Sequence, residues 1–227
     1  MHTMKTTVRS LLALVILASM SLAQGPAAPT KGSRQVPPDQ NPAAKAFDDK
    51  AITLRPPNGE KVAIIMFEDL ECPDCARAHP LVMEAKKVYK ISVVAHNFPL
   101  PMHPWSFQAA LYAVYFKNIS DKLDAGWRDY CFTNQPSING ENLRQYAETF
   151  AKANNVKLPI VLDPNDKLAK TVKDDIALGQ RLGVTYTPTI WVVNNNTASR
   201  NDSPFVEVLP DRSNLFQLID QLKASAK

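Results

Sequence analysis

Two cysteines separated by two residues are the clearest chemical feature of this chain. Cys72-Pro73-Asp74-Cys75 closely follows a continuous apolar run and opens a segment with helical character. Because the first turn of a helix concentrates unpaired N–H groups and positive partial charge, it favours a thiolate at Cys72, which we expect to be the exposed cysteine. A thiolate there would attack a disulfide, and Cys75 would then resolve the mixed disulfide. Pro73 suits a first-turn position because it lacks an N–H.

The cysteine pair has two other interpretations, which are a structural disulfide and half of a metal site. A zinc site needs about four nitrogen or sulfur ligands. His79 lies four residues after Cys75 and could join a metal, but Cys131 is far along the chain and no fourth ligand is evident. We therefore favour a redox pair and expect no metal. The dithiol itself carries two electrons, so no cofactor is expected either.

The segments around the pair predict an α/β protein. Residues 62–67 form an apolar run typical of a strand covered on both faces. Residues 73–89 are expected to form a helix and residues 91–96 a second strand. Strand, helix and strand in this order suggest a right-handed βαβ unit. Residues 51–55 are expected to form a short edge strand.

The second half of the chain is predicted to be helical and then to return to strands. Asp163-Pro164 is expected to open the last helix of the helical block and Gly183 to end it. The sequence therefore predicts βαβ, a block of helices, and then ββα. The predicted elements are helices at 105–116, 119–131, 141–153 and from 163, strands at 188–193 and 205–209, and a final helix at 213–226.

Three segments resemble DsbA-like members of the thioredoxin superfamily: residues 67–75 around the cysteines, residues 98–104, and residues 181–189. The resemblance implies a thioredoxin fold with a helical insertion between the βαβ and ββα halves. The domain would span residues 51–227 and the insertion about 101–182. The Thr187–Pro188 bond would be cis and would face the cysteine pair, presenting the Thr187 backbone to an extended substrate segment.

The chain departs from the family pattern at one position. Met66 stands six residues before Cys72, where these relatives typically carry a buried acid. Glu68, Asp69 and Glu71 are nearby and are expected to be partly solvated acids at the end of the strand, although one of them could take the missing role.

The acid inside the motif is a second point of interest. The Asp74 carboxylate should disfavour the Cys72 thiolate and give a reduction potential below roughly −120 mV, the value for DsbA. Thr187, the residue before the proline, resembles the residue at this position in the isomerase and reductase branch of the superfamily. Residues 24–50, however, are too short to form the dimerisation domain of that branch. These hints conflict over the redox direction.

The N-terminus predicts export. Residues 1–23 fit a signal peptide, with Lys5 and Arg9 before an apolar stretch and a cleavage site before Gln24. Residues 24–50 are rich in Pro and Ala and fit a flexible leader. The net charge of +4 is mild and no basic run is dense, so nucleic acid is not an expected partner. We expect a periplasmic or otherwise exported protein without stable membrane insertion after cleavage.

The expected function is a thiol–disulfide oxidoreductase that works as an oxidase on cysteine-containing exported proteins. The resemblance to DsbA implies reoxidation by a membrane redox partner. The alternatives are a disulfide reductase or isomerase of the same fold, a chaperone-like binding module whose cysteine pair is a staple, and a metal carrier. Cys131 is expected to be a buried free cysteine, and the three tryptophans, Trp105, Trp127 and Trp191, are expected to be core residues.

Overall fold

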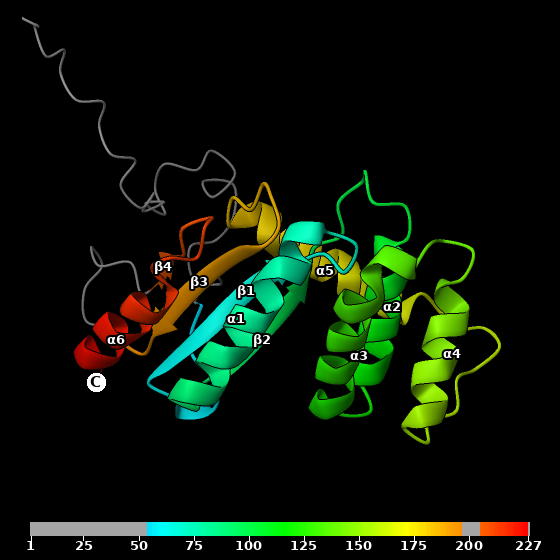
Figure 1. The fold of residues 1–227 in the computed structure, drawn as a ribbon, viewed down its shortest axis with the longest axis horizontal. Coiled ribbons are helices and arrows are strands. Elements are labelled where there is room, and N and C mark those ends of the chain that lie inside the picture. The colour runs from blue at the N-terminus through cyan, green and yellow to red at the C-terminus, as the bar shows by residue number, and fades with distance from the viewer. Residues whose placement is uncertain (1–53, 197–204, 227) are drawn as a thin grey trace, which may run out of the picture. The chain divides into compact units, whose positions relative to one another are not determined.

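The structure is a computed structural model that describes residues 54–196 and 205–226 (Figure 1). Chain contacts divide the protein into two units, Met1–Gly32 and Ser33–Lys227, and every described residue lies in the second. The predicted signal peptide and leader lie outside the described residues. Within the described part, no helix is both long enough and apolar enough to cross a membrane.

A four-stranded sheet forms the centre of the described unit. Its strands are β1 (Val62–Glu68), β2 (Ser92–Asn97), β3 (Thr189–Asn194) and β4 (Phe205–Glu207), in the order β2-β1-β3-β4. Strand β1 pairs in parallel with β2 and antiparallel with β3, which itself pairs antiparallel with β4. All seven residues of β1 are buried, which explains why this strand has a continuous apolar run in place of alternation.

Alternate residues of β1 pack into two different layers. Ile64 and Met66 join a core cluster with α1 (Pro73–Tyr89) and α6 (Leu215–Ser225). Ile65 and Phe67 face the other side of the sheet and join a cluster that includes residues of α5. Figure 1 shows α1 and α6 on one face of the sheet and α5 on the other. The period-two geometry of a strand therefore places neighbouring β1 residues in different cores.

Four helices lie between β2 and β3 in the chain: α2 (Ser106–Lys117), α3 (Asp121–Asn134), α4 (Leu143–Ala153) and α5 (Lys167–Arg181). A cluster of aromatic side chains joins α2, α3 and α4, with Phe116, Trp127 and Phe150 in mutual ring contact. The same cluster contains Cys72 and Cys75, so the helical block packs directly against the start of α1. Short 3₁₀ turns occupy Pro57–Gly59 and Gln135–Ser137.

The predicted order of βαβ, helices and ββα is confirmed, and α1 has the predicted limits. Most other bounds differ by one to three residues, and two predictions were wrong by more. Leu54 and Arg55 belong to no strand, while residues 51–53 of the expected edge strand lie outside the described part. Helix α5 begins at Lys167 and not at Asp163, because the chain first turns through Asp166 with a left-handed φ of 54°. Asp163 still acts as a cap, since its Oδ2 accepts the Ala169 N–H at 2.8 Å.

Candidate active site

Cys72 is the N-cap residue of α1, and Pro73 occupies the first helical position. A turn joins the helix to β1, closed by a hydrogen bond from Cys72 N–H to the Asp69 carbonyl at 3.1 Å. The Cys72 carbonyl then accepts the first helical bond, from Ala76 N–H at 3.2 Å. This local geometry places the Cys72 sulfur beside the unpaired N–H groups of the first turn, as the sequence predicted.

The Cys72 thiolate is strongly stabilised. The pKa of Cys72 is lowered to about 5, chiefly by a hydrogen bond from the Cys75 thiol. Burial opposes this, and Thr187 and the backbone N–H groups of Cys75 and Asp74 add to the stabilisation. Cys72 is only 6% exposed, so the expectation of an exposed sulfur was wrong: the helical block packs over it.

Cys75 has the opposite character. It is fully buried, and burial raises its pKa well above the ordinary value, with the negative charge of Glu68 adding to the effect. Its sulfur accepts the Asp69 N–H at 3.4 Å. Both cysteines are free thiols in this structure. The pair is thus divided into one sulfur whose pKa favours the thiolate and one whose pKa favours the protonated thiol.

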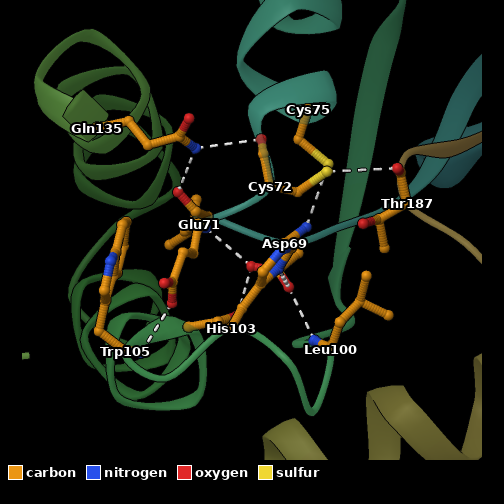
Figure 2. Close-up of polar contacts among 11 residues, drawn as sticks. Asp69, Glu71, Cys72, Cys75, Leu100, His103, Trp105, Gln135 and Thr187 are labelled. Atoms are coloured by element: carbon orange, nitrogen blue, oxygen red, sulfur yellow. Dashed lines mark hydrogen bonds and ion pairs between the residues drawn. The ribbon is translucent and has the colours of Figure 1, made fainter. Parts of the chain in front are cut away.

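Thr187 and Pro188 lie directly against the pair. The peptide bond between them is cis, as the resemblance implied, and the Cys72 sulfur lies 3.4 Å from the Thr187 carbonyl oxygen (Figure 2). Pairing of Phe67 with Thr189 across the sheet sets this position, because it brings the start of β3 next to the end of β1. The Thr187 hydroxyl is buried and meets the geometric criteria for a hydrogen bond with no described residue, but the Thr187 side chain still lowers the pKa of the neighbouring Cys72.

Asp69 ties the turn before Cys72 to residues 100–106 (Figure 2). Its Oδ1 accepts from Glu71 N–H at 2.8 Å and from the Ser106 hydroxyl. Its Oδ2 accepts from Leu100 N–H at 2.8 Å and pairs with His103 Nδ1 at 2.6 Å. Asp69 is 1% exposed, so the expectation of a partly solvated acid was wrong.

Glu71 and Gln135 connect the same turn to the helical block. Glu71 accepts the Trp105 N–H at 2.8 Å, and burial raises the pKa of its carboxyl group. Gln135 Nε2 donates to the carbonyls of Leu70 and Cys72 at 2.8 and 3.1 Å (Figure 2). Gln135 was not predicted as a site residue, because no local sequence pattern marks a polar side chain whose partners lie more than 60 residues away.

Glu68 is a buried acid that lies two residues after Met66, on the same face of β1. It is 2% exposed, which again contradicts the expected solvation, and its Oε1 bonds Arg128 Nη1 at 2.8 Å. Arg128 Nε bonds Asp124 at 2.7 Å, and its Nη2 donates to Asn97 Oδ1 at 3.0 Å. Three acceptors therefore hold one buried guanidinium, and the two acids raise its pKa despite burial.

The second carboxylate oxygen of Glu68, Oε2, does not share the contact with Arg128. Within the described residues, Glu68 Oε2 and His79 Nδ1 are buried without a hydrogen-bond partner. Both residues line a pocket of about 160 Å³ between β1, β2, α1 and α3, together with Met66, Lys86 and Lys117 among others. A polar pocket of this size can hold several water molecules.

The remaining predicted site residues are also located. Pro73 is exposed on the first turn, and the Asp74 carboxylate pairs with Arg77 at 3.0 Å and Arg212 at 2.5 Å. In the part of the chain that the structure describes, no group of three or more His, Cys, Asp or Glu side chains could hold a metal. The nearest acid to His79 Nε2 is Asp129 at 3.5 Å.

A family model for thioredoxin matches residues 59–209, which cover every strand and all the residues of this site but Arg212. The chain belongs to the thioredoxin family. This confirms the predicted superfamily and the α/β class. Cys131, in the helical block of this thioredoxin-family domain, is fully buried and free, and Trp105, Trp127 and Trp191 are core residues, as predicted.

Several solved structures share the fold at low sequence identity. Wolbachia pipientis alpha-DsbA1 is 18% identical with a TM-score of 0.60, covering 77% of this chain and 94% of that one. A periplasmic thioredoxin-like protein from Salmonella enterica serovar Typhimurium is 16% identical with a TM-score of 0.57, covering 74% and 87%. The thiol-disulfide exchange protein alpha-DsbA2 from Wolbachia pipientis is 17% identical with a TM-score of 0.55, covering 73% and 83%. A search of curated sequences gives no match.

Proposed function

We propose that this chain is an exported thiol–disulfide oxidoreductase that oxidises cysteine pairs in other exported proteins. The observation that carries the proposal is the division of the pair, with a Cys72 pKa of about 5 and a Cys75 pKa well above its ordinary value. A stabilised thiolate favours the reduced form of the protein, so the Cys72–Cys75 disulfide is readily given away.

The proposed exchange conserves electrons. A substrate thiolate attacks the Cys72 sulfur of the Cys72–Cys75 disulfide, forming a mixed disulfide and releasing Cys75 as a thiolate that takes up a proton. The second substrate thiolate then attacks the substrate sulfur of the mixed disulfide and releases Cys72 as a thiolate. The substrate loses two electrons and the Cys72–Cys75 pair gains them. A membrane redox partner that accepts two electrons would restore the disulfide.

Three groups would support these steps. The Thr187 carbonyl, next to Cys72, would pair with an extended substrate segment in the manner of an added strand. The hydroxyl of Thr187, buried and otherwise unpartnered, would donate to the Cys72 thiolate. Glu68, whose charge acts on Cys75 and which is among the residues lining the pocket, would exchange the Cys75 proton with water there.

The reduction potential in glutathione buffers tests the direction of the reaction. A Cys72 pKa of about 5 lies between roughly 7 for thioredoxin and roughly 3.5 for DsbA, so we expect a potential between about −200 and −120 mV. A potential near −270 mV, together with efficient reduction of insulin, would overturn the oxidase and favour the reductase. A Cys72→Ser variant with full activity towards client proteins would instead favour a chaperone-like module.

Export is tested on the full chain. The support for export is the pattern of residues 1–23 and the periplasmic thioredoxin-like protein among the structural neighbours. We expect the protein in a periplasmic or secreted fraction, with Gln24 as the first residue of the mature chain. Retention in the cytoplasm with residues 1–23 attached would contradict this.

A further inference from the structure

The acid inside the cysteine motif is held by two arginines that come from different parts of the chain. Asp74 Oδ1 bonds Arg77, three residues further along α1, at 3.0 Å. Asp74 Oδ2 bonds Arg212, which lies in the turn between β4 and α6, at 2.5 Å. The Arg212 guanidinium also approaches the Asp74 carbonyl at 3.4 Å. One guanidinium therefore contacts both the carboxylate and the backbone of the residue between the two cysteines.

The two arginines differ in their exposure to water. The Arg77 side chain is 68% exposed, whereas that of Arg212 is 14% exposed. Ion pairs in contact with water are weakened by solvent and salt, and shielded pairs are weakened much less. Arg212 is therefore the stronger of the two partners for the charge of Asp74.

A tight turn fixes the backbone at Arg212, whose side chain reaches Asp74. Arg212 has a left-handed φ of 60°, which is unfavourable for a residue other than glycine or asparagine. A tight turn holds it there, with Arg212 N–H bonded to the Leu209 carbonyl at 2.7 Å and Leu215 N–H bonded to the Arg212 carbonyl at 3.2 Å. Asp211 fixes the next residue by accepting the N–H of Ser213 at 3.1 Å.

We infer that Arg212 sets the reactivity of Cys72 by neutralising the Asp74 carboxylate, so that an acidic residue within the motif does not oppose the Cys72 thiolate. Arg212 is a positioning residue, since it acts through Asp74 and does not touch the sulfur. A motif with an internal acid can therefore carry a thiolate that the neighbouring Cys75 thiol and backbone N–H groups stabilise. The inference rests on the proposed thiol–disulfide exchange, but the ionisation of Cys72 can be measured whether the enzyme oxidises or reduces its substrates.

Other charged groups surround the cysteines and stay unchanged in the variants proposed below. They lie in the turn before Cys72, in the segment after β2, and in the buried pair that involves α3. These groups are Asp69, Glu71, His103, Glu68 and Arg128. Because none of them bonds Asp74 or Arg212 in the described structure, a change at Arg212 reports on the Asp74 charge.

The experiment measures the rate of iodoacetamide alkylation of Cys72 against pH in the reduced full-length protein. For Arg212→Asn, whose side chain tolerates the left-handed backbone, we expect the equilibrium constant for thiolate formation to fall by about three- to tenfold. For Asp74→Asn, which leaves Arg212 unpaired, we expect it to rise. The double variant should return close to the natural protein, and Arg212→Lys should retain most of the natural value.

Two controls separate this effect from simple loss of structure. Arg77→Asn removes the exposed partner of the same acid and should change the constant less than Arg212→Asn. Arg144→Asn removes an ion-paired arginine far along the chain, bonded to Glu148 at 2.8 Å, and should leave the constant unchanged. The inference is wrong if Arg212→Asn and Asp74→Asn shift the equilibrium constant for thiolate formation in the same direction. It is also wrong if Arg212→Asn lowers the unfolding temperature but leaves this equilibrium constant unchanged. The proposed function fails separately, through the glutathione potential or an active Cys72→Ser protein.

Discussion

Cys75 is fully buried, and in the proposed mechanism its proton is exchanged through Glu68. The charge of Glu68 acts on Cys75 from the end of β1, where Glu68 is also among the residues lining the pocket. The negative charge of Glu68 has two opposite consequences. It raises the pKa of Cys75, which slows attack by this thiol, and it provides a base that can accept the proton.

The substitution Glu68→Gln distinguishes these two effects. If Glu68 serves as the base, resolution of a mixed disulfide on Cys72 slows by about tenfold or more near neutral pH, and the difference disappears at high pH where Cys75 ionises unaided. If Glu68 acts only through its charge, the same variant resolves faster. Stopped-flow mixing of the reduced protein with an oxidised peptide gives this rate.

Asp124→Asn is the matched control for Glu68→Gln. Asp124 binds the same guanidinium at 2.7 Å, so its loss also leaves Arg128 with one acid. Its charge is not among the main causes of the raised pKa of Cys75, so the rate of resolution should follow the natural pH profile. A similar loss of rate in both variants would mean that the Arg128 network supports the fold and not the proton transfer.

At the level of elements, the contact between α5 and the sheet depends on one glycine. A Cβ atom at Gly179 would lie 2.6 Å from Phe98 Cε2 and 2.9 Å from Phe67 Cδ1, distances that side chains do not adopt without movement. We expect Gly179→Ala to lower the free energy of unfolding by about 1–3 kcal/mol despite the better helix propensity of alanine. Urea unfolding at constant pH measures the change.

Gly126 provides the comparison within another helix. A Cβ atom there would come no closer than 3.3 Å to a heavy atom, Phe150 Cζ. The gain in helix propensity is the same, so Gly126→Ala should cost less than Gly179→Ala. Equal costs for the two variants would show that close packing of α5 is not the cause.

Helices and strands could be predicted where a few neighbouring residues determine them. The contacts of the site could not be predicted where they join residues far apart in the chain. The apolar run of β1 and the proline after Cys72 mark the strand and the helix start within a few residues, and both were correct. The bond between Glu68 and Arg128 joins residues 60 positions apart, and the contact of Arg212 with Asp74 joins residues 138 positions apart. No periodicity or short motif encodes such pairs, so acids that look solvated at the end of a strand are in fact buried.

For the whole molecule, the ionised Cys72 links redox state to stability. The pKa of Cys72 is lowered to about 5 in the folded reduced protein, whereas an unfolded cysteine has a pKa of roughly 8.5. Between these values the unfolded chain binds a proton that the folded protein does not, so the free energy of unfolding rises with pH. This contribution is complete above the unfolded pKa and is lost as the pH falls through about 5. The oxidised protein has no Cys72 thiol and therefore lacks this contribution to the free energy of unfolding.

We therefore expect the reduced protein to be more stable than the oxidised protein at pH 8, and the advantage to shrink on going to pH 5. Urea unfolding of both redox forms at these two pH values measures the difference directly. The Cys72–Cys75 disulfide closes only a very short loop, so its entropic effect on the unfolded chain is small and does not reverse the order. An oxidised form that is the more stable at pH 8 would mean that the fold does not favour the thiolate, and the protein would then hold its disulfide and not donate it.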